Sequence, residues 1–469
     1  MNTKQLRQTI LDLAIRGELV PQDPSDEPAS VLLERIRAEK EQLIKDKKLK
    51  RDKKESEPID EVPFELPEGW EWCRLKEITT ELKYGTSEKS SLEGKIPVLR
   101  MGNITTNGTI DYSNIVFSSN EEDIKEFLLT KGNLVFNRTN SSDLVGKTAI
   151  YRGEIPAIFA GYLIKIALLK VNPEYTNLAM NSSYYRKWCY SVKSDAVNQS
   201  NINAEKLSNL LIPLPPLAEQ HRIVQKIEQL LTIVDTIEQL QEELKALIKQ
   251  TKNQVLNYAI AGKLTHQDPN DEPAEELLKR IGKTTAADTP YEKLPKGWAW
   301  CRLGDIGEII GGGTPSTSIE EYWNGEVSWI TPADLSNYSD KYIAQGKRNI
   351  TQLGLDNSSA KLIPKGSILF STRAPIGYVV IADRPLSTNQ GFKSLSLSIN
   401  MSEEFVYYFL LAEKERIKLL ASGTTFQELS ASAFSKILIP LPPLAEQHRI
   451  VQQIKNYFTA FDQIEKELA

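Results

Sequence analysis

The side chains that most often carry enzyme chemistry are sparse in this sequence and do not form a catalytic set. Three histidines occur in 469 residues, and none is spaced with cysteine as in a zinc site. His221 and His448 stand in two copies of the sequence Ala-Glu-Gln-His-Arg, which indicates a duplicated role in helix capping or packing. The glycines at 311–313 lack the Gly-Lys-Ser/Thr ending of a phosphate-binding loop, so we interpret them as a flexible turn.

Other kinds of catalytic site are also not indicated. The acidic residues between positions 235 and 243 fall on the predicted outer face of a helix, where solvated charge is the usual role. No glycine-rich loop after a strand suggests bound S-adenosylmethionine, and the Asn/Asp-Pro-Pro-aromatic tetrapeptide of base amino-methylation is absent. We therefore predict a chain with no catalytic residues, no metal site and no cofactor of its own.

The composition is typical of a globular protein. Apolar residues make up 40% and charged residues 25% of the chain, and the formal net charge is −5. No apolar stretch approaches the ~20 residues that span a bilayer. Three scattered cysteines are too few for a disulfide framework. We therefore expect buried free thiols, a cytoplasmic location and no membrane association, and the net charge gives no signature of nucleic-acid binding.

Long repeats indicate that the chain is an internal duplication. The repeated blocks are IPLPPLAEQHRIVQKI at 212–227 with 439–454, WEWCRLKEI at 70–78 with 298–306, and the segment 10–36 with 255–281. Between these blocks lie two stretches that share little sequence, 79–205 and 307–432. Both mix β-rich segments with Gly, Asn and Ser turns and a later helix, predicted at 175–192 and 402–421. The same repeated blocks thus surround two variable regions that differ from each other in sequence.

After each Leu-Pro-Pro-Leu-Ala-Glu-Gln segment the chain is predicted to be helical. Apolar residues alternate at spacings of four and three, which is the seam of a coiled coil. In the first copy this seam begins with Ile223, Ile227, Leu230, Val234 and Ile237. The seam could dock helices of a partner or could form a closed internal pair, and the pattern leaves both interpretations open.

The repeat is also cyclic. Alignment places Ala469 opposite Glu242 and Met1 opposite Ala246, so a second long helix is predicted to be split between the two termini. The fold class predicted is α+β, with two mixed α/β domains separated by a long antiparallel two-helix coiled coil in a pseudo-twofold arrangement whose termini meet. The predicted segments are 1–20 and 439–469 for the split helix, 21–61 for a corner and charged insertion, 62–211 and 283–438 for the α/β domains, and 212–282 for the continuous helix.

An Asp-Glu-Pro segment follows each helix end, at 22–28 and 267–273. Proline and Asp or Asn end one helix, and Glu-Pro-Ala begins the next. This pattern predicts a structural corner. A carboxylate-rich metal loop is the alternative interpretation, although EF-hand spacing is absent.

These features together resemble the specificity subunit of a type I restriction–modification system. The likeness rests on the two LPPLAEQHRIV copies that lead into long helices, the two Trp-x-Trp-Cys-Arg-Leu segments and the cyclic repeat, and it covers essentially the whole chain. It implies two target recognition domains, each reading one half of a bipartite site in double-stranded DNA, with helices that set the gap. It also implies two modification subunits, which use S-adenosylmethionine to methylate adenine, and restriction subunits, which use ATP to cleave DNA. A coiled-coil structural adaptor without DNA binding is the alternative, but it does not explain why the framed regions differ.

Polar, turn-rich loops in the two variable regions are the predicted DNA contacts. Arg, Lys, Asn and Gln pair with base edges, whereas Lys, Arg, Ser and Thr contact phosphates. The predicted contacts are Lys83, Tyr84, Thr86, Asn137, Arg138, Asn140, Asn198 and Gln199 in the first region, and Thr314, Ser316, Thr372, Arg373, Asn389, Gln390, Thr425 and Gln427 in the second. Arg138 and Arg373 are the preferred base contacts, and we expect them to occupy corresponding places.

Overall fold

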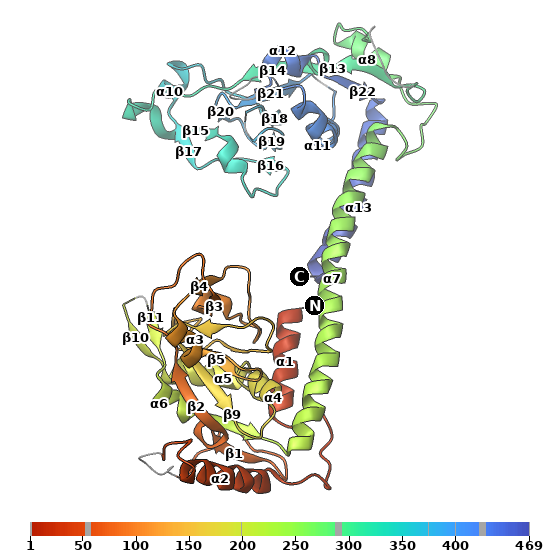
Figure 1. Ribbon diagram of the computed structural model, residues 1–469. Helices are drawn as coiled ribbons and strands as arrows, with labels where there is room; N and C mark the ends of the chain where they lie inside the picture. Colours follow the sequence, from red (N-terminus) through yellow and green to blue (C-terminus); the bar gives the residue numbers. More distant parts are fainter. Residues whose placement is uncertain are drawn as a thin grey trace. The chain divides into compact units, whose positions relative to one another are not determined.

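The structure is a computed structural model that describes residues 2–51, 58–197, 199–286, 293–373, 375–398, 400–421 and 428–468. The chain divides into two units, Met1–Gln241 and Glu242–Ala469, called here unit 1 and unit 2 (Figure 1). The long helix α7 (Leu217–Ile260) contributes residues to both units. In the described part of the chain, no helix combines the length and apolar character needed to cross a membrane.

Unit 1 is a mixed α/β domain. Its larger sheet has the strand order β2-β9-β5-β7, and the smaller sheets have the orders β4-β3-β8, β10-β11-β6 and β1-β12. The helices are α1 (Thr3–Ile15), α2 (Ala29–Lys45), η1 (Leu75–Ile78), η2 (Met101–Asn103), α3 (Glu121–Phe127), α4 (Pro173–Ala179), α5 (Ser183–Val192) and α6 (Ala204–Ser208). The strands are β1 (Glu71–Arg74), β2 (Thr79–Tyr84), β3 (Ile96–Leu99), β4 (Val116–Ser118), β5 (Leu134–Asn137), β6 (Thr139–Asn140), β7 (Thr148–Ile150), β8 (Ile158–Phe159), β9 (Leu163–Leu168), β10 (Ser194–Ala196), β11 (Gln199–Asn201) and β12 (Leu211–Leu214).

Unit 2 has the same kind of architecture. Its sheets have the orders β14-β21-β18-β19-β16, β17-β15-β20 and β13-β22. The helices are α8 (Ala274–Arg280), α9 (Leu303–Ile306), η3 (Glu320–Tyr322), η4 (Pro332–Leu335), α10 (Gln352–Asp356), α11 (Glu403–Lys418), α12 (Ala431–Ser435) and α13 (Leu444–Leu468). The strands are β13 (Ala299–Arg302), β14 (Gly307–Gly311), β15 (Trp323–Ile330), β16 (Tyr342–Ile343), β17 (Arg348–Ile350), β18 (Ile368–Ser371), β19 (Val379–Ala382), β20 (Ser387–Thr388), β21 (Phe392–Leu397) and β22 (Leu438–Leu441).

The central strand of each unit separates two hydrophobic cores. In β5, Leu134 and Phe136 belong to one core cluster and Val135 to another. In β18, Phe370 belongs to one core cluster and Leu369 to another. Successive strand residues point to opposite faces, so a continuous apolar run is what a strand buried on both faces requires. The prediction of two mixed α/β domains built on one plan is confirmed.

The terminal helices pack antiparallel to α7. In unit 1, Ile10 and Ala14 of α1 share a core cluster with Ile223 and Ile227 of α7. In unit 2, the side chain of Lys252 on α7 forms an ion pair with Asp462 on α13 (2.7 Å), while Ile454 of α13 and Val255 of α7 belong to one core cluster. The predicted pairing of helices is therefore present in each unit. The meeting of the two termini stays a prediction, since Met1 and Ala469 lie outside the described residues.

The predicted late helix of the first variable region is two helices. α4 ends at Ala179 and α5 begins at Ser183, and the Ser182 side chain caps α5 by accepting a hydrogen bond from Tyr185 N (3.2 Å). A capping serine offers the backbone an alternative to continuing the helix. In the second region a single helix, α11, is present, as predicted.

Candidate nucleic-acid interface

The Leu-Pro-Pro-Leu-Ala-Glu-Gln segments form the joint at which a short strand leads into a long helix. In unit 1, Glu219 is 1% exposed, and its carboxylate accepts hydrogen bonds from Trp70 Nε1 (3.0 Å) and Gln22 Nε2 (3.2 Å). Burial raises the pKa of Glu219 above its ordinary value. The next residue, Gln220, is fully buried, and its side-chain oxygen accepts a hydrogen bond from Asn172 N (2.8 Å) at the start of α4. The motif therefore fixes the helix to the strands and to α4.

Unit 2 repeats this joint with equivalent residues. Glu446 accepts hydrogen bonds from Trp298 Nε1 (2.9 Å) and Gln267 Nε2 (3.1 Å). Gln447 accepts a hydrogen bond from Ser402 N (3.0 Å), next to the first turn of α11. The duplicated sequence thus has a structural cause, because the same buried polar contacts are needed twice.

The two Asp-Glu-Pro corners are closed by ion pairs. Arg222 on α7 pairs with Asp26 (2.6 Å), and Arg449 on α13 pairs with Asp271 (2.5 Å). In the described ranges no group of three or more His, Cys, Asp or Glu side chains is placed to hold a metal ion. His221 Nδ1 lies 3.0 Å from Asn172 Nδ2, so this histidine contributes to packing at the joint, as expected.

The predicted seam is closed inside unit 1 and is not a free docking face. Ile223, Ile227 and Val234 are buried, Leu230 packs against the same core cluster, and Ile237 is half-buried. α1 covers this cluster together with Trp70 and with Tyr175 of α4. The internal pair is observed for Ile223, Ile227, Leu230 and Val234, so their assignment to partner docking is corrected, whereas that of Ile237 stays a prediction.

A different face of α7 carries the exposed apolar residues. Ile233 and Leu240, both in unit 1, are 56% and 57% exposed. Residues seven apart on a helix lie on one face. This stripe was not predicted from the sequence, because a denser apolar seam runs beside it. The seven-residue spacing was the available signal.

In unit 1 the structure brings several of the predicted contacts together. The Arg138 guanidinium lies 4.7 Å from the centre of the Tyr84 ring, and Tyr84 Oη accepts a hydrogen bond from Ala204 N (3.0 Å). Strand β6, which contains Asn140, pairs with β11, which contains the exposed Gln199. Asn198 lies outside the described residues. These side chains come from segments far apart in sequence and now form one surface cluster.

Three predicted contacts in unit 1 are paired or buried within the unit. Thr86 is buried, and its hydroxyl hydrogen-bonds the Asp123 carboxylate. Lys83 forms an ion pair with Glu126 (3.1 Å). Asn137 is fully buried, and neither of its side-chain amide atoms has a hydrogen-bond partner among the described residues. Thr86 and Asn137 thus do not present their side chains at the surface, contrary to the expectation of exposed loops.

In unit 2 the predicted loops also meet. Thr314 Oγ1 donates a hydrogen bond to Gln390 Oε1 (2.5 Å), and both residues are exposed, as is Ser316. The half-buried Asn389 turns its side chain onto Gly391 N (2.9 Å). Thr372 is fully buried and donates through its side chain to the Gly391 carbonyl (3.2 Å), so it does not present its side chain at the surface. Thr425 and Gln427 lie outside the described residues.

Arg373, the preferred contact in unit 2, is already paired. Its guanidinium lies 2.9 Å from the Glu428 carboxylate, and Lys393 approaches the same carboxylate at 3.6 Å. The hydrogen bond from Arg373 is the main reason that the pKa of Glu428 lies below its ordinary value. The charge of Arg373 is therefore compensated within the unit.

The structure also corrects the expectation that Arg138 and Arg373 occupy corresponding places. The pairing of β5 with β9 in unit 1 and of β18 with β21 in unit 2 places Phe136 and Phe370 at equivalent positions of the two sheets. Arg138 therefore corresponds to Thr372, one residue before Arg373. A shift of one residue in an extended segment turns the side chain to the opposite face. Matching the two arginines by residue type overlooks this offset.

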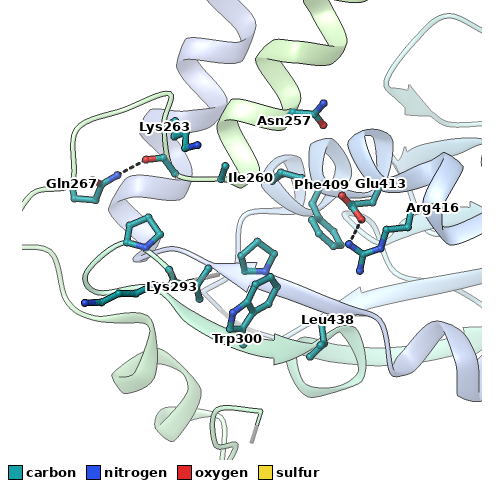
Figure 2. A pocket seen from close by; sticks show the side chains of 15 residues that line it. Asn257, Ile260, Lys263, Gln267, Lys293, Trp300, Phe409, Glu413, Arg416 and Leu438 are labelled. Atoms are coloured by element: carbon teal, nitrogen blue, oxygen red, sulfur yellow. Dashed lines mark hydrogen bonds and ion pairs between the residues drawn. The ribbon is translucent and has the colours of Figure 1, made fainter. Parts of the chain in front are cut away.

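A pocket of about 620 Å³ lies in unit 2 at the C-terminal end of α7, and fifteen residues line it (Figure 2). Trp300 and Phe409 provide apolar walls, and the ion pair of Glu413 with Arg416 (3.1 Å) lies at one side. In unit 1 Phe64 packs on Trp72, the repeat equivalent of Trp300, with ring centres 4.9 Å apart. Since the chain itself covers the equivalent tryptophan in unit 1, we assign no ligand to the pocket.

Comparisons with known proteins agree with these features. The model of a family described as "Type I restriction modification DNA specificity domain" matches residues 67–246 and 295–469. The EcoEI specificity subunit of Escherichia coli is 29% identical over an alignment that covers 99% of this chain and 90% of that protein. The MjaIX specificity subunit of Methanocaldococcus jannaschii is 43% identical over 184 residues, a match that covers 39% of this chain and 42% of that protein.

Solved structures show the same fold. A chain from a study of complex assembly and conformational transition in a type I R-M system superposes with a TM-score of 0.63 at 20% identity, covering 87% of this chain and 94% of that one. The HsdS subunit from Thermoanaerobacter tengcongensis gives a TM-score of 0.55 at 21% identity, covering 88% and 94%. Because the family model matches two segments that together make up more than half of the sequence, the chain belongs to the family of type I restriction modification DNA specificity proteins.

Proposed function

We propose that this chain is the DNA-recognition subunit of a type I restriction–modification complex, in which each unit reads one half of a bipartite site. The observation that carries the proposal is a pair of matched sheets with different side chains at matched positions. Tyr84 and Arg138 in unit 1 stand where unit 2 has Gly311 and Thr372. Base pairs are distinguished by their hydrogen-bond patterns in the grooves, so two readers with different side chains select different sequences.

We assign the two target recognition domains to residues 62–211 and 283–438, which contain the candidate contacts. In unit 1 the proposed contacts are Arg138 on Tyr84, Asn140 and Gln199. In unit 2 they are Thr314, Ser316 and Gln390. Arg138 and Asn140 are half-buried and the other side chains are exposed. In protein–DNA complexes, phosphate contacts position the protein and base contacts specify the sequence.

The helices would serve as spacer and docking element. The exposed stripe of Ile233 and Leu240 has the spacing that a helix of a partner subunit would cover, and exposed apolar residues of this regularity mark interaction sites. We propose two modification subunits as these partners, with restriction subunits joining the assembly. Adenine methylation with S-adenosylmethionine and ATP-dependent cleavage would then belong to the partners, in the cytoplasm, and this chain would contribute no catalytic residue.

A mobility-shift experiment tests the proposal against a structural adaptor that does not bind DNA. The full-length chain, alone and co-expressed with its modification subunit, is mixed with a random pool of duplexes, and retained DNA is sequenced. Retention of duplexes that share a two-part motif supports recognition. If neither preparation retains duplex DNA above an unrelated protein control, the adaptor is the better description.

A variant pair adds resolution to this test. Replacing Arg138 with alanine should weaken binding to the selected motif by ~1–3 kcal/mol if the guanidinium contacts a base. Lys131→Ala is the matched control, because Lys131 is an exposed cation on the turn that precedes β5. Equal effects of the two substitutions would contradict the assignment of Arg138.

A further inference from the structure

The small sheet of unit 2 presents an arginine that the loop patterns of the sequence do not single out. The Arg348 guanidinium lies 3.7 Å from the centre of the Trp323 ring and 5.8 Å from that of Trp329. The two indole rings pack edge to face, with centres 5.2 Å apart. Arg348 is exposed, whereas both tryptophans are buried. One side of the Arg348 guanidinium thus rests on the tryptophan rings, and the side chain is exposed to solvent.

Within the described part of unit 2, the charge of Arg348, unlike that of Arg373, is not compensated by a carboxylate. Among the described residues, no carboxylate lies within ion-pair distance of its guanidinium, and no acceptor takes a hydrogen bond from it. Arg373 in the same unit is held by Glu428. A guanidinium stacked on a ring keeps its N–H groups at the free edge, where they match two acceptors at once. Stacking also restricts the side chain before binding, so less conformational entropy is lost on contact.

The tryptophans connect Arg348 to the candidate contact loop of unit 2. Trp323 Nε1 donates a hydrogen bond to the Ser316 carbonyl (3.1 Å), and Trp329 Nε1 donates to the Gly313 carbonyl (2.9 Å). The loop that contains Thr314 is therefore anchored on the same two rings that support the guanidinium. Arg348 and this loop belong to one surface cluster.

The equivalent sheet of unit 1 lacks this device. Trp329 pairs with Arg348 across the β15–β17 ladder, and at the matching register Val98 pairs with Val116 in β3–β4. The parallel neighbours Ser387 and Ile158 confirm the equivalence of the two sheets. The two units thus differ in charge and hydrogen-bonding capacity at this position.

We infer that Arg348 is a specificity-determining residue that reads a guanine in the half-site of unit 2, an inference that rests on the proposed function. Guanine presents O6 and N7 side by side in the major groove, and a guanidinium donates to both at once. Adenine and the pyrimidines offer no such pair of acceptors there. Unit 1, with valines at the matching positions, reads its half-site without an arginine from this sheet.

The test is selection of binding sites from a random duplex pool with the full-length chain in complex with its modification subunit. The wild-type chain should yield a two-part motif with a strict guanine in the part assigned to unit 2, an assignment made by exchanging residues 307–432. Arg348→Ala should make that position degenerate, leave the other part unchanged and weaken binding to the wild-type site roughly 5- to 150-fold. Arg348→Lys, which keeps the charge without the planar fork, should also lose the preference.

The control is Arg384→Ala, because Arg384 is an exposed arginine of the same unit with no ring support among the described residues. It should select the wild-type motif. Thermal melting and near-ultraviolet circular dichroism establish that each variant is folded. If Arg348→Ala keeps the strict guanine, or weakens binding to all sequences equally as a phosphate contact would, the inference is overturned. If the wild-type chain selects no two-part motif, the proposed function itself fails, and the inference fails with it.

Discussion

The buried carboxylate of Glu219 provides a quantitative test of the joint between strand and helix. Glu219→Ala leaves the indole N–H of Trp70 without its acceptor in a buried site, whereas Gln22, which also donates to the Gly17 carbonyl (2.6 Å), loses one of its acceptors. An unsatisfied buried donor costs about 1–3 kcal/mol, and hydrogen bonds to a charged group contribute about 1.5–3 kcal/mol. We expect unit 1 to lose about 2–3 kcal/mol of stability. For a domain of this size, that loss lowers the melting temperature by roughly 4–12 °C.

Glu219→Gln separates the hydrogen bonds from the charge. Glutamine keeps an oxygen for Trp70 and removes the charge that burial disfavours, so its cost should be under about 1 kcal/mol. Since the pKa of Glu219 is raised in the folded protein, the stability associated with its protonation is present below the unfolded pKa and is lost as the pH rises through the folded value. The free energy of unfolding of the glutamine variant should therefore increase relative to that of the wild type as the pH rises above about 4.5.

Differential scanning calorimetry of the full-length chain measures these effects, with Glu446→Ala as the equivalent change in unit 2. Each alanine variant should lower the transition of its own unit, because Glu446 accepts the same two kinds of hydrogen bond. The reasoning is refuted if the alanine and glutamine variants of Glu219 are equally destabilised, or if neither alanine variant shifts a transition.

Three further outcomes are expected. Leu240→Asp should leave the melting temperature of the isolated chain unchanged, because Leu240 is 57% exposed on α7. The same substitution should prevent co-purification with the modification subunit, and intact assembly would contradict the docking proposal. Cys73 and Cys189 should react with a thiol reagent at pH 8 only after guanidinium denaturation, because both are buried. Burial raises the pKa of both thiols, that of Cys189 to about 11. Rapid labelling of the native protein would contradict this expectation. Gly312→Ala should destabilise unit 2, because the added Cβ would lie 1.9 Å from the backbone carbonyl oxygen of Asn389. Gly311→Ala should be tolerated, because no atom lies within 4 Å of its added Cβ. Similar melting temperatures of the two variants would contradict the close approach at Gly312.

Features that depend on local pattern were predictable from the sequence. The helix seam follows from heptad spacing, and the corners follow from the Asp-Glu-Pro punctuation. The mixed α/β character follows from short β-rich segments between turns. Each of these rests on neighbouring residues, and the duplication doubles the signal.

Features that depend on contacts between distant segments were not predictable. Thr86 belongs to a polar loop sequence, yet it is buried because its strand end meets β8 and its hydroxyl finds Asp123. Arg373 looks like a free loop arginine, and its pairing with Glu428 arises from a bridge across more than fifty residues of chain. Arg348 has no motif around it, and only the packing of two tryptophans shows how it is held.

The most direct test of the central claim, that the two units read different halves of one site, is methylation profiling after a domain exchange. N6-methyladenine is mapped in a host that carries this chain with its modification subunit, and residues 79–205 are then replaced by the equivalent region of another family member. We predict a gapped two-part motif, of which only one part changes after the exchange. A change in both parts, or a motif without two separate parts, would contradict the account.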